Sequence, residues 1–336
     1  MSETNLPPVV ALGNVTHRFG DVTALDGLTL VVPARRITVL LGPNGAGKTT
    51  AIRVITGALS PAVGEVCTFG LDPRVEGDDI RPRCGVVSAK PALYDRLSGY
   101  DNLLYSARLY GVADRGVSER IRAAAGRFGI DTALEHQVGG YSTGMKTRLA
   151  LARSVLHRPE LLLFDEPTSG LDPESAHAVL ELIRDMTDDG HTVVMCTHLL
   201  AEAEGLADHV VVMEAGATLV SGAPDELTGR YWPGDLVFLD AESPDQLDRV
   251  ATWNGVVGYD RPPGGAAEVR VDGPGRIPDL VMGLVRDGVR VTRVQQHTPT
   301  LEDLYFAVRR ESAGGGLAPV ERGVVPASRE QIGASR

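Results

Sequence analysis

The sequence predicts an α/β protein with a mostly parallel sheet, and two observations lead to that prediction. From Val9 to about Gly222, short apolar runs alternate with helical patterns, an order typical of parallel strands joined by crossover helices. Within this stretch the glycine-rich loop Gly42–Thr49 follows the apolar run Ile37–Leu41 and precedes a segment that can begin a helix. This order of strand, loop and helix predicts a ligand site at the carboxyl end of that strand.

The remaining elements of this region are assigned from apolar runs and helical periodicity. Further strands are expected at 161–164, 192–197 and 209–214, and helices at 100–110, 118–128 and 143–156. Between Cys84 and Arg158 the sequence pattern is mostly helical. We therefore expect an α-helical insert at about residues 85–158 within an α/β domain of residues 9–222.

A second, smaller domain is expected at residues 235–310, after a connector that begins near Ser221 and contains several glycines and prolines. Its strands are predicted at 236–239, 256–259, 268–271 and 290–295, and its helices at 243–252, 277–287 and 301–308. The β-α-β-β-α-β order is typical of a small ferredoxin-like α+β domain. The tail, residues 311–336, contains a run of glycines and scattered proline, alanine and serine, and we expect it to be disordered.

The composition excludes several functional classes. The formal net charge is −11 and there is no basic block, which disfavours nucleic acid as a partner. The cysteines Cys67, Cys84 and Cys196 share no metal-ligand spacing and read as reduced thiols. The amino terminus lacks the pattern of a signal peptide, and no apolar run approaches the roughly 20 residues of a membrane span. If the protein acts at a membrane, another chain supplies the spans.

The loop Gly42–Thr49 matches the phosphate-loop pattern G-x-x-x-x-G-K-[ST] in full. Its glycines let several backbone N–H groups point at one phosphate, and the following helix adds the positive end of its dipole. Lys48 would reach the β- and γ-phosphates, and the Thr49 hydroxyl would bind Mg²⁺. The nucleotide-binding residues predicted here are Gly42, Pro43, Asn44, Gly45, Ala46, Gly47, Lys48, Thr49 and Thr50.

Two acidic residues follow the apolar run Leu161–Phe164, which should form a buried strand. Asp165, at the tip of this strand, can hold Mg²⁺ directly or through water. Glu166 lies one residue further on, where a carboxylate can polarise the attacking water. A surface Asp-Glu pair after a core strand is the plainer alternative, and the phosphate loop upstream favours the functional interpretation.

A histidine ends another predicted buried strand, Thr192–Thr197. The carboxyl ends of parallel strands border the crevice in which α/β proteins bind ligands. His198 is therefore predicted to hydrogen-bond the γ-phosphate and to hold the water and Glu166 in register. An isolated histidine is more often incidental, so this prediction rests on its position after the strand.

With these motifs in order, residues 9–222 resemble the nucleotide-binding subunit of an ATP-binding cassette (ABC) transporter. Gly42–Thr49 resembles the Walker A loop, and Leu161–Glu166 resembles Walker B with its catalytic glutamate. The segment 169–172 matches the D-loop, and His198 matches the switch histidine. Thr16–Gly20 resembles the A-loop, which implies that Phe19 stacks on adenine. The resemblance implies a P-loop NTPase that binds ATP and Mg²⁺ and hydrolyses ATP, with Lys48, Glu166 and His198 as catalytic residues.

The family's Leu-Ser-Gly-Gly-Gln signature has its counterpart in Tyr141–Met145, ahead of a predicted helix. A serine and a glycine at a helix start offer a hydroxyl and N–H groups to an anion. The resemblance implies that Ser142 and Gly144 contact the γ-phosphate of a nucleotide held by a second copy, in a head-to-tail dimer. Thr143 and Met145 depart from the family's glycine and glutamine.

A more serious departure lies at Ala89, which stands where the family has its Q-loop glutamine. A methyl group cannot bind Mg²⁺ or orient water. Our hypothesis is that Thr49, Asp165, phosphate oxygens and water hold the metal, with weaker coupling to the partner. No Asn-Lys-x-Asp guanine motif occurs in the sequence, and the preference for ATP over GTP rests mainly on the resemblance.

The leading functional hypothesis is an ATPase that docks on separate transmembrane permease subunits at the cytoplasmic face of the cell membrane. Docking is expected around Leu93–Leu104, where Tyr94, Leu97 and Tyr100 either line a groove or pack inside the helical insert. The signature and the ending Thr298–Leu304 resemble drug-, antibiotic- or polysaccharide-type exporters, which favours export. The alternative is a soluble regulatory or ribosome-associated ABC ATPase without a membrane partner. The transported substrate is not readable from this chain.

Overall fold

The computed structural model describes residues 6–232, 234–262, 266–273 and 275–313. The chain divides after Gly222 into two compact units, and Ala223 begins the second. We describe each unit by itself.

The first unit contains a six-stranded sheet in the order β5-β6-β7-β3-β8-β9. All neighbours pair in parallel except β8 and β9, which form an antiparallel hairpin. The strands are β3 (Ile37–Leu41), β5 (Cys84–Val87), β6 (Leu161–Asp165), β7 (Thr192–Thr197), β8 (His209–Glu214) and β9 (Ala217–Gly222). Every residue of β3, β6 and β7 is buried, as the continuous apolar runs of these three strands predict.

A second sheet in this unit is antiparallel and has the order β2-β1-β4. Its strands are β1 (Val10–Phe19), β2 (Val22–Val32) and β4 (Val63–Thr68). Helix α1 (Lys48–Ile55) contributes Ile52 and Ile55 to a continuous apolar core that also contains residues of both sheets. This core fixes the start of α1, and with it the loop before it, against the sheet.

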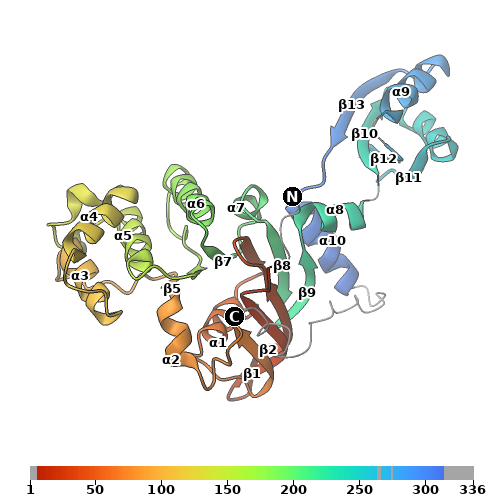
Figure 1. The fold of residues 1–336 in the computed structure, drawn as a ribbon. Coiled ribbons are helices and arrows are strands. Elements are labelled where there is room, and N and C mark those ends of the chain that lie inside the picture. Colours follow the sequence, from red (N-terminus) through yellow and green to blue (C-terminus); the bar gives the residue numbers. More distant parts are fainter. Residues whose placement is uncertain (1–5, 233, 263–265, 274, 314–336) are drawn as a thin grey trace. The chain divides into compact units, whose positions relative to one another are not determined.

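The helices α3 (Gly99–Leu109), α4 (Val117–Arg127) and α5 (Thr143–Val155) gather into one group, drawn in yellow to green in Figure 1. The expected helical insert is therefore present, but it does not begin at 85, because residues 84–87 pair with β6 as part of the parallel sheet. The short elements of this unit are α2 (Gly77–Ile80), η1 (Arg81–Arg83), η2 (Asp131–Ala133), η3 (Val138–Gly140) and α7 (Leu200–Glu204). The longer helix α6 (Pro173–Asp188) lies between β6 and β7 in sequence.

The second unit begins with α8 (Pro224–Tyr231) and then shows the expected β-α-β-β-α-β order. It comprises β10 (Asp235–Ala241), the 3₁₀ helix η4 (Pro244–Thr252), β11 (Val256–Asp260), β12 (Ala267–Val271), α9 (Arg276–Arg286) and β13 (Val291–His297). The antiparallel sheet has the order β11-β12-β10-β13. Strand β12 thus lies between β10 and β11, the two strands of the first β-α-β unit. This is the ferredoxin-like arrangement, and its apolar core includes Val237, Leu239, Val269, Leu280 and Leu284.

The last described element is α10 (Leu301–Ala313), which packs against α8. This helix continues past Val308 into the segment that we expected to be disordered. Thr300 caps its start: the Thr300 hydroxyl accepts a hydrogen bond from Asp303 N–H at 3.2 Å, and the Asp303 carboxylate accepts one from Thr300 N–H at 2.9 Å. The rest of the expected tail, residues 314–336, lies outside the described residues. No helix in the described part of the chain is long and apolar enough to cross a membrane.

Candidate functional site

The site lies where three parallel strands end at one edge of the six-stranded sheet. Leu41 of β3 pairs with Thr197 of β7, and Asp165 of β6 pairs with Cys196 of β7. The loop after β3, Glu166 after β6 and His198 after β7 therefore begin at the same edge. This is the edge at which parallel α/β sheets bind their ligands.

The glycine-rich loop ends at the amino terminus of α1. Gly47 has a φ of 99°, and a Cβ built there would lie 2.5 Å from the carbonyl oxygen of Ala24 in β2. Only glycine fits this combination of a left-handed backbone and close approach. Gly45 also has a positive φ, of 85°. The loop thus has the tight curvature that a backbone cradle for phosphate requires.

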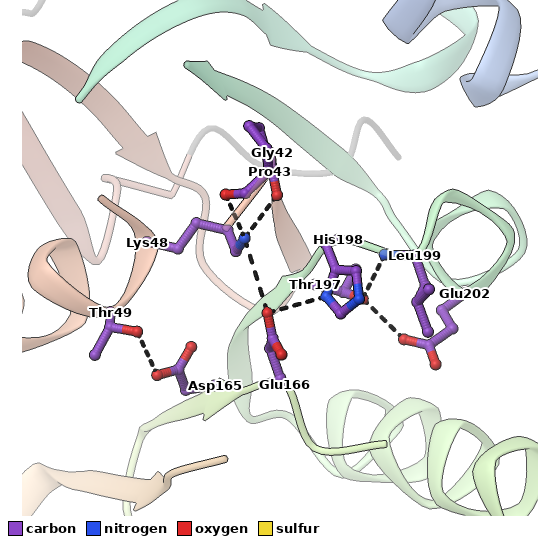
Figure 2. A network of polar contacts seen from close by, with 10 residues as sticks. All are labelled: Gly42, Pro43, Lys48, Thr49, Asp165, Glu166, Thr197, His198, Leu199 and Glu202. Atoms are coloured by element: carbon purple, nitrogen blue, oxygen red, sulfur yellow. Dashed lines mark hydrogen bonds and ion pairs between the residues drawn. The ribbon is translucent and has the colours of Figure 1, made fainter. Parts of the chain in front are cut away.

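Lys48 is buried, with 6% of its surface exposed, and its ammonium lies inside this loop. Its Nζ donates hydrogen bonds to the carbonyl oxygens of Gly42 at 2.6 Å and Pro43 at 3.2 Å. It also lies 3.9 Å from Oε1 of Glu166. Figure 2 shows Lys48 extending across the loop toward that carboxylate. A lysine bound mainly to neutral carbonyls can exchange those partners for phosphate oxygens.

Thr49 and Asp165 are 116 positions apart in sequence and are joined by a hydrogen bond. The Thr49 hydroxyl donates to Oδ2 of Asp165 at 2.7 Å, and Asp165 is only 8% exposed. A hydroxyl and a carboxylate are ligands that Mg²⁺ accepts, with water and phosphate completing an octahedron. No cluster of three or more metal-binding side chains of the His, Cys, Asp and Glu types occurs in the described segments. Thr49 and Asp165 supply two oxygen ligands of the kinds that Mg²⁺ accepts.

Glu166 and His198 form the second polar contact at the strand ends. His198 Nδ1 lies 3.0 Å from Oε1 of Glu166, which fits a hydrogen bond between them. In Figure 2 Asp165 points toward Thr49, whereas Glu166 points toward Lys48 and His198. The two consecutive acids thus serve different parts of one site.

The backbone of Glu166 explains how it reaches this position. Its φ is 50°, in the left-handed region that non-glycine residues rarely adopt. Its N–H donates to the carbonyl of Cys196 at 2.9 Å, and its own carbonyl accepts from Ser169 N–H at 3.1 Å. The neighbouring strand and the following turn therefore impose a conformation that costs about 1–3 kcal/mol. No sequence pattern indicates this backbone conformation.

Thr197 and Glu202 support the turn that contains His198, and sequence reasoning did not single them out. The Thr197 hydroxyl donates to Oε2 of Glu202 at 2.9 Å and accepts from Leu199 N–H at 3.0 Å. The second bond is the local turn that threonine favours at a strand end. That preference of threonine for a turn is the only feature of the sequence that points to Thr197 as a supporting residue. Behind the site, burial raises the pKa of the Cys196 thiol well above its usual range, so it remains a neutral thiol.

Phe19 lies at the end of β1 in the hairpin with β2, where it pairs with Val22. Its ring is 46% exposed and meets His17 edge-on, with ring centroids 4.7 Å apart. Since β2 continues to Ala24, which borders Gly47, the hairpin leads toward the phosphate loop. An exposed aromatic face on this hairpin is available for stacking.

Ser142 and Gly144 lie at the start of α5. The Ser142 hydroxyl caps this helix by accepting a hydrogen bond from Met145 N–H at 3.2 Å. Within the described residues, no hydrogen bond or ion pair joins Ser142 or Gly144 to Lys48, Thr49, Asp165 or Glu166. The chain by itself thus brings together the loop, the two acids and the histidine, but not the α5 start.

Comparison with known proteins gives a consistent picture. Residues 25–169 match a family model described as "ABC transporter". The chain is 34% identical over 236 residues to the ABC transporter ATP-binding protein NatA of Bacillus subtilis. The matched region covers 69% of this chain and 96% of that protein. It is 33% identical to the daunorubicin/doxorubicin resistance ATP-binding protein DrrA of Streptomyces peucetius, over 86% of this chain and 89% of that protein.

Two further similarities extend the comparison. The Nod factor export ATP-binding protein I of Rhizobium meliloti is 31% identical and covers 88% of this chain, with 87% of its own length matched. A solved structure titled as the ATP-binding subunit of an ABC transporter superposes with a TM-score of 0.61 at 27% identity. That superposition covers 66% of this chain and 93% of the other.

Proposed function

Because the chain belongs to the ATP-binding proteins of ABC transporters and is an ATPase, we propose that it powers export through separate membrane subunits. The observation that supports this most directly is the network at the strand ends, Thr49–Asp165 and Lys48–Glu166–His198 (Figure 2). It combines a phosphate cradle, a metal-binding pair and a base held by a histidine. A transport ATPase needs these three parts in one site.

The phosphate loop, residues 42–50, would hold the nucleotide with its N–H groups and Lys48, and Phe19 would stack on the adenine. The site contains two carboxylates, Asp165 and Glu166, and one lysine. A triphosphate adds further negative charge, so a divalent cation is needed to balance it. Thr49 and Asp165 would hold this Mg²⁺, which when bound offsets the charge on the β- and γ-phosphates.

Glu166 would act as the general base that takes a proton from the attacking water. Its contact with His198 keeps the carboxylate oriented at the strand ends, as a base held by a third group should be. His198 would also donate to the γ-phosphate from Nε2, which requires the doubly protonated ring, because Nδ1 donates to the Glu166 carboxylate and a neutral imidazole has only one N–H. The Lys48 ammonium would exchange its hydrogen bonds to the carbonyls of Gly42 and Pro43 for hydrogen bonds to the phosphate oxygens.

A second copy of the chain would complete the site. Ser142 and Gly144 begin a helix whose N–H groups and dipole favour an anion, but within the described part of one chain no hydrogen bond or ion pair joins them to Lys48. We therefore propose a head-to-tail dimer in which these residues of each copy meet the γ-phosphate held by the other. ATP would close the dimer, and hydrolysis would release it.

Export is the favoured direction because two of the similar proteins are named for drug resistance and for Nod factor export. The permease would present this chain at the cytoplasmic face of the membrane. Docking would use the region around Leu93–Leu104, where Tyr94 is 52% exposed and Leu97 is 37% exposed. Of the three side chains expected there, Tyr94 and Leu97 are therefore exposed and Tyr100 is half-buried.

The test is reconstitution of the chain with its membrane subunits. The purified chain should co-purify with a multi-spanning protein, and ATP hydrolysis by the complex should drive substrate into inverted vesicles. Cells that lack the complex should lose resistance to, or secretion of, one compound among candidate drugs, lipids and saccharides. If the chain co-purifies with ribosomes or with no membrane protein, the soluble regulatory alternative is favoured instead.

A further inference from the structure

A cavity of about 220 Å³ lies in the first unit, between β5, the loop after it, α3 and α5. Its lining includes Tyr94, Tyr105, Tyr110, Arg153 and His157, and no acidic residue. The cavity is separate from the nucleotide site, since none of the phosphate-loop residues lines it. Its size lies below the roughly 300–1,000 Å³ of pockets that enclose small-molecule ligands. It is large enough for side chains of another protein.

Among the described residues that line this cavity, Arg153 carries the only positive charge. The His157 Nε2 lies 2.9 Å from the carbonyl of Cys84, which can only accept, so this nitrogen bears the proton. Burial also lowers the pKa of His157, which keeps the ring neutral at physiological pH. The Arg153 guanidinium remains charged.

The charge of Arg153 has no carboxylate to balance it. In the described part of the chain its side chain donates one hydrogen bond, from Nη1 to the carbonyl of Ala92, and forms no ion pair. Burial lowers the pKa of Arg153, and the opposing influences come only from Tyr110 and Tyr94. A half-buried guanidinium with neutral neighbours is costly, because the protein replaces water with few compensating charges.

Two structural roles account for part of this placement. Arg153 lies in the last turn of α5, where the helix dipole favours a cation, and its bond to Ala92 ties down the loop after β5. Neither role needs a guanidinium that lines a cavity. A helix dipole favours any cation in the last turn, and a lysine or glutamine could donate to the same carbonyl.

The rim of the cavity is suited to a protein partner. Tyr94 is 52% exposed, Tyr105 is 50% exposed and Leu109 is 71% exposed. These three side chains line the cavity together with Arg153 and give it an apolar rim. The rings of Tyr94 and Tyr105 meet edge-on, with their centroids 5.2 Å apart. Tyrosine and arginine are the residue types that dominate binding at protein interfaces.

We propose that this cavity receives a carboxylate side chain, Asp or Glu, from a cytosolic segment of the membrane subunit, and that Arg153 pairs with it. The proposal rests on the proposed function, because it names the chemistry of the permease segment that docks here. The occupant packs against the exposed rim formed by Tyr94, Tyr105 and Leu109, and its carboxylate gives the Arg153 guanidinium the charge partner that it lacks. Arg153 is thus the residue that selects an acidic segment.

This position also links docking to the nucleotide site. Arg153 belongs to α5, the helix that Ser142 caps at its other end. A rigid helix at ~1.5 Å per residue places the two about 16 Å apart. A displacement of α5 at Arg153 therefore also moves Ser142, which is proposed to contact the nucleotide of the partner copy.

The test uses the full chain and the membrane subunit that co-purifies with it. Arg153→Glu should weaken assembly by about 30-fold or more, as expected for a desolvated charge pair that loses one partner. Arg153→Gln retains a donor for Ala92 but should also weaken assembly. Arg158→Glu is the matched control, because Arg158 is exposed just beyond α5 and outside the cavity, and it should assemble normally.

Each Asp and Glu in the cytosolic loops of the membrane subunit is then changed to Arg and combined with Arg153→Glu. One reversal should restore assembly, while the same reversal weakens assembly with the unaltered chain. Circular dichroism and the melting temperature confirm that each variant folds. Normal assembly of Arg153→Gln, or no restoring reversal with folded Arg153→Glu, overturns the pairing alone. If the unaltered chain assembles with no membrane protein, the proposed function fails as well.

Discussion

Glu166 shows how one backbone conformation shapes the site. In a regular strand consecutive side chains point to opposite faces, so Asp165 and Glu166 would diverge. The left-handed φ of Glu166 ends that alternation, and its carboxylate meets His198 while Asp165 meets Thr49. The proposed division of the two acids, Glu166 as the base and Asp165 as a metal ligand, depends on this backbone turn.

Glu166→Gln should permit ATP binding and dimer closure but slow hydrolysis by about 10²–10⁴-fold, because an amide cannot accept the proton of the water. Single-turnover hydrolysis of radiolabelled ATP measures this. The matched control is Glu160→Gln, which alters a surface carboxylate that is paired with Arg83 and lies just before the start of β6. Hydrolysis by Glu166→Gln at the unaltered rate would show that another group is the base.

Ala89→Gln tests the departure at the Q-loop position. An added amide oxygen should supply a ligand that Ala89 lacks and lower the Mg²⁺ concentration for half-maximal ATP hydrolysis by about tenfold, the lower end of the change in metal affinity when a supporting residue of a metal site is altered. Metal titrations of the rate provide the measurement. Lys90→Gln, which places the same amide one residue further on, should have no such effect. If Mg²⁺ dependence, ATPase rate and transport all remain unchanged in Ala89→Gln, the missing glutamine has no consequence.

At the scale of elements, the helices α3 and α5 begin in the same way. Ser98 accepts a hydrogen bond from Asp101 N–H at 3.0 Å, as Ser142 does from Met145 N–H at 3.2 Å. The two caps should contribute equally to stability, but only Ser142 is proposed to meet a nucleotide. This pair separates the structural role of a capping serine from its role in the dimer.

Ser142→Ala and Ser98→Ala should each lower the free energy of unfolding by about 1 kcal/mol, the usual contribution of an N-cap. Urea denaturation measures that loss. Only Ser142→Ala should also slow steady-state ATP hydrolysis and weaken the ATP-bound dimer. Equal loss of hydrolysis in both variants would mean that Ser142 acts only as a cap.

The elements themselves follow closely from local sequence. Strands β3, β7 and β8 have the predicted bounds, because each is a continuous apolar run between polar residues. Residues 84–87 are different. This strand, Cys-Gly-Val-Val, is short and only its pairing with β6 makes it part of the sheet, so its sequence did not separate it from the helices that follow.

At the scale of the whole molecule, the division after Gly222 permits a test of the second unit. Removing residues from Ala223 onward should leave ATP preference unchanged and weaken dimerisation of the Glu166→Gln variant in ATP by about tenfold or more. The reason is that we expect the second unit to contact its counterpart in the other copy, and such a second contact would raise the overall affinity. Cutting at Ala223 rather than at Leu236 removes α8 with its partner α10, so no buried face of α8 is exposed.

Sedimentation velocity measures the monomer–dimer equilibrium of this truncated chain. Its fold is checked by nucleotide binding, which depends on the first unit and its own apolar core. An unaltered equilibrium would mean that the second unit does not hold the copies together.

The sequence by itself determined the α/β class, the order of the motifs and the chemistry available at each, because these depend on local pattern and residue type. It also determined the β-α-β-β-α-β order of the second unit. Only the tertiary structure decided which residues meet. Thr49 and Asp165 are 116 positions apart and Glu166 and His198 are 32 apart, and the parallel register of β3, β6 and β7 brings them to one edge. The unpaired charge of Arg153 likewise depends on packing, because sequence distance does not reveal which carboxylates a folded chain keeps away from an arginine.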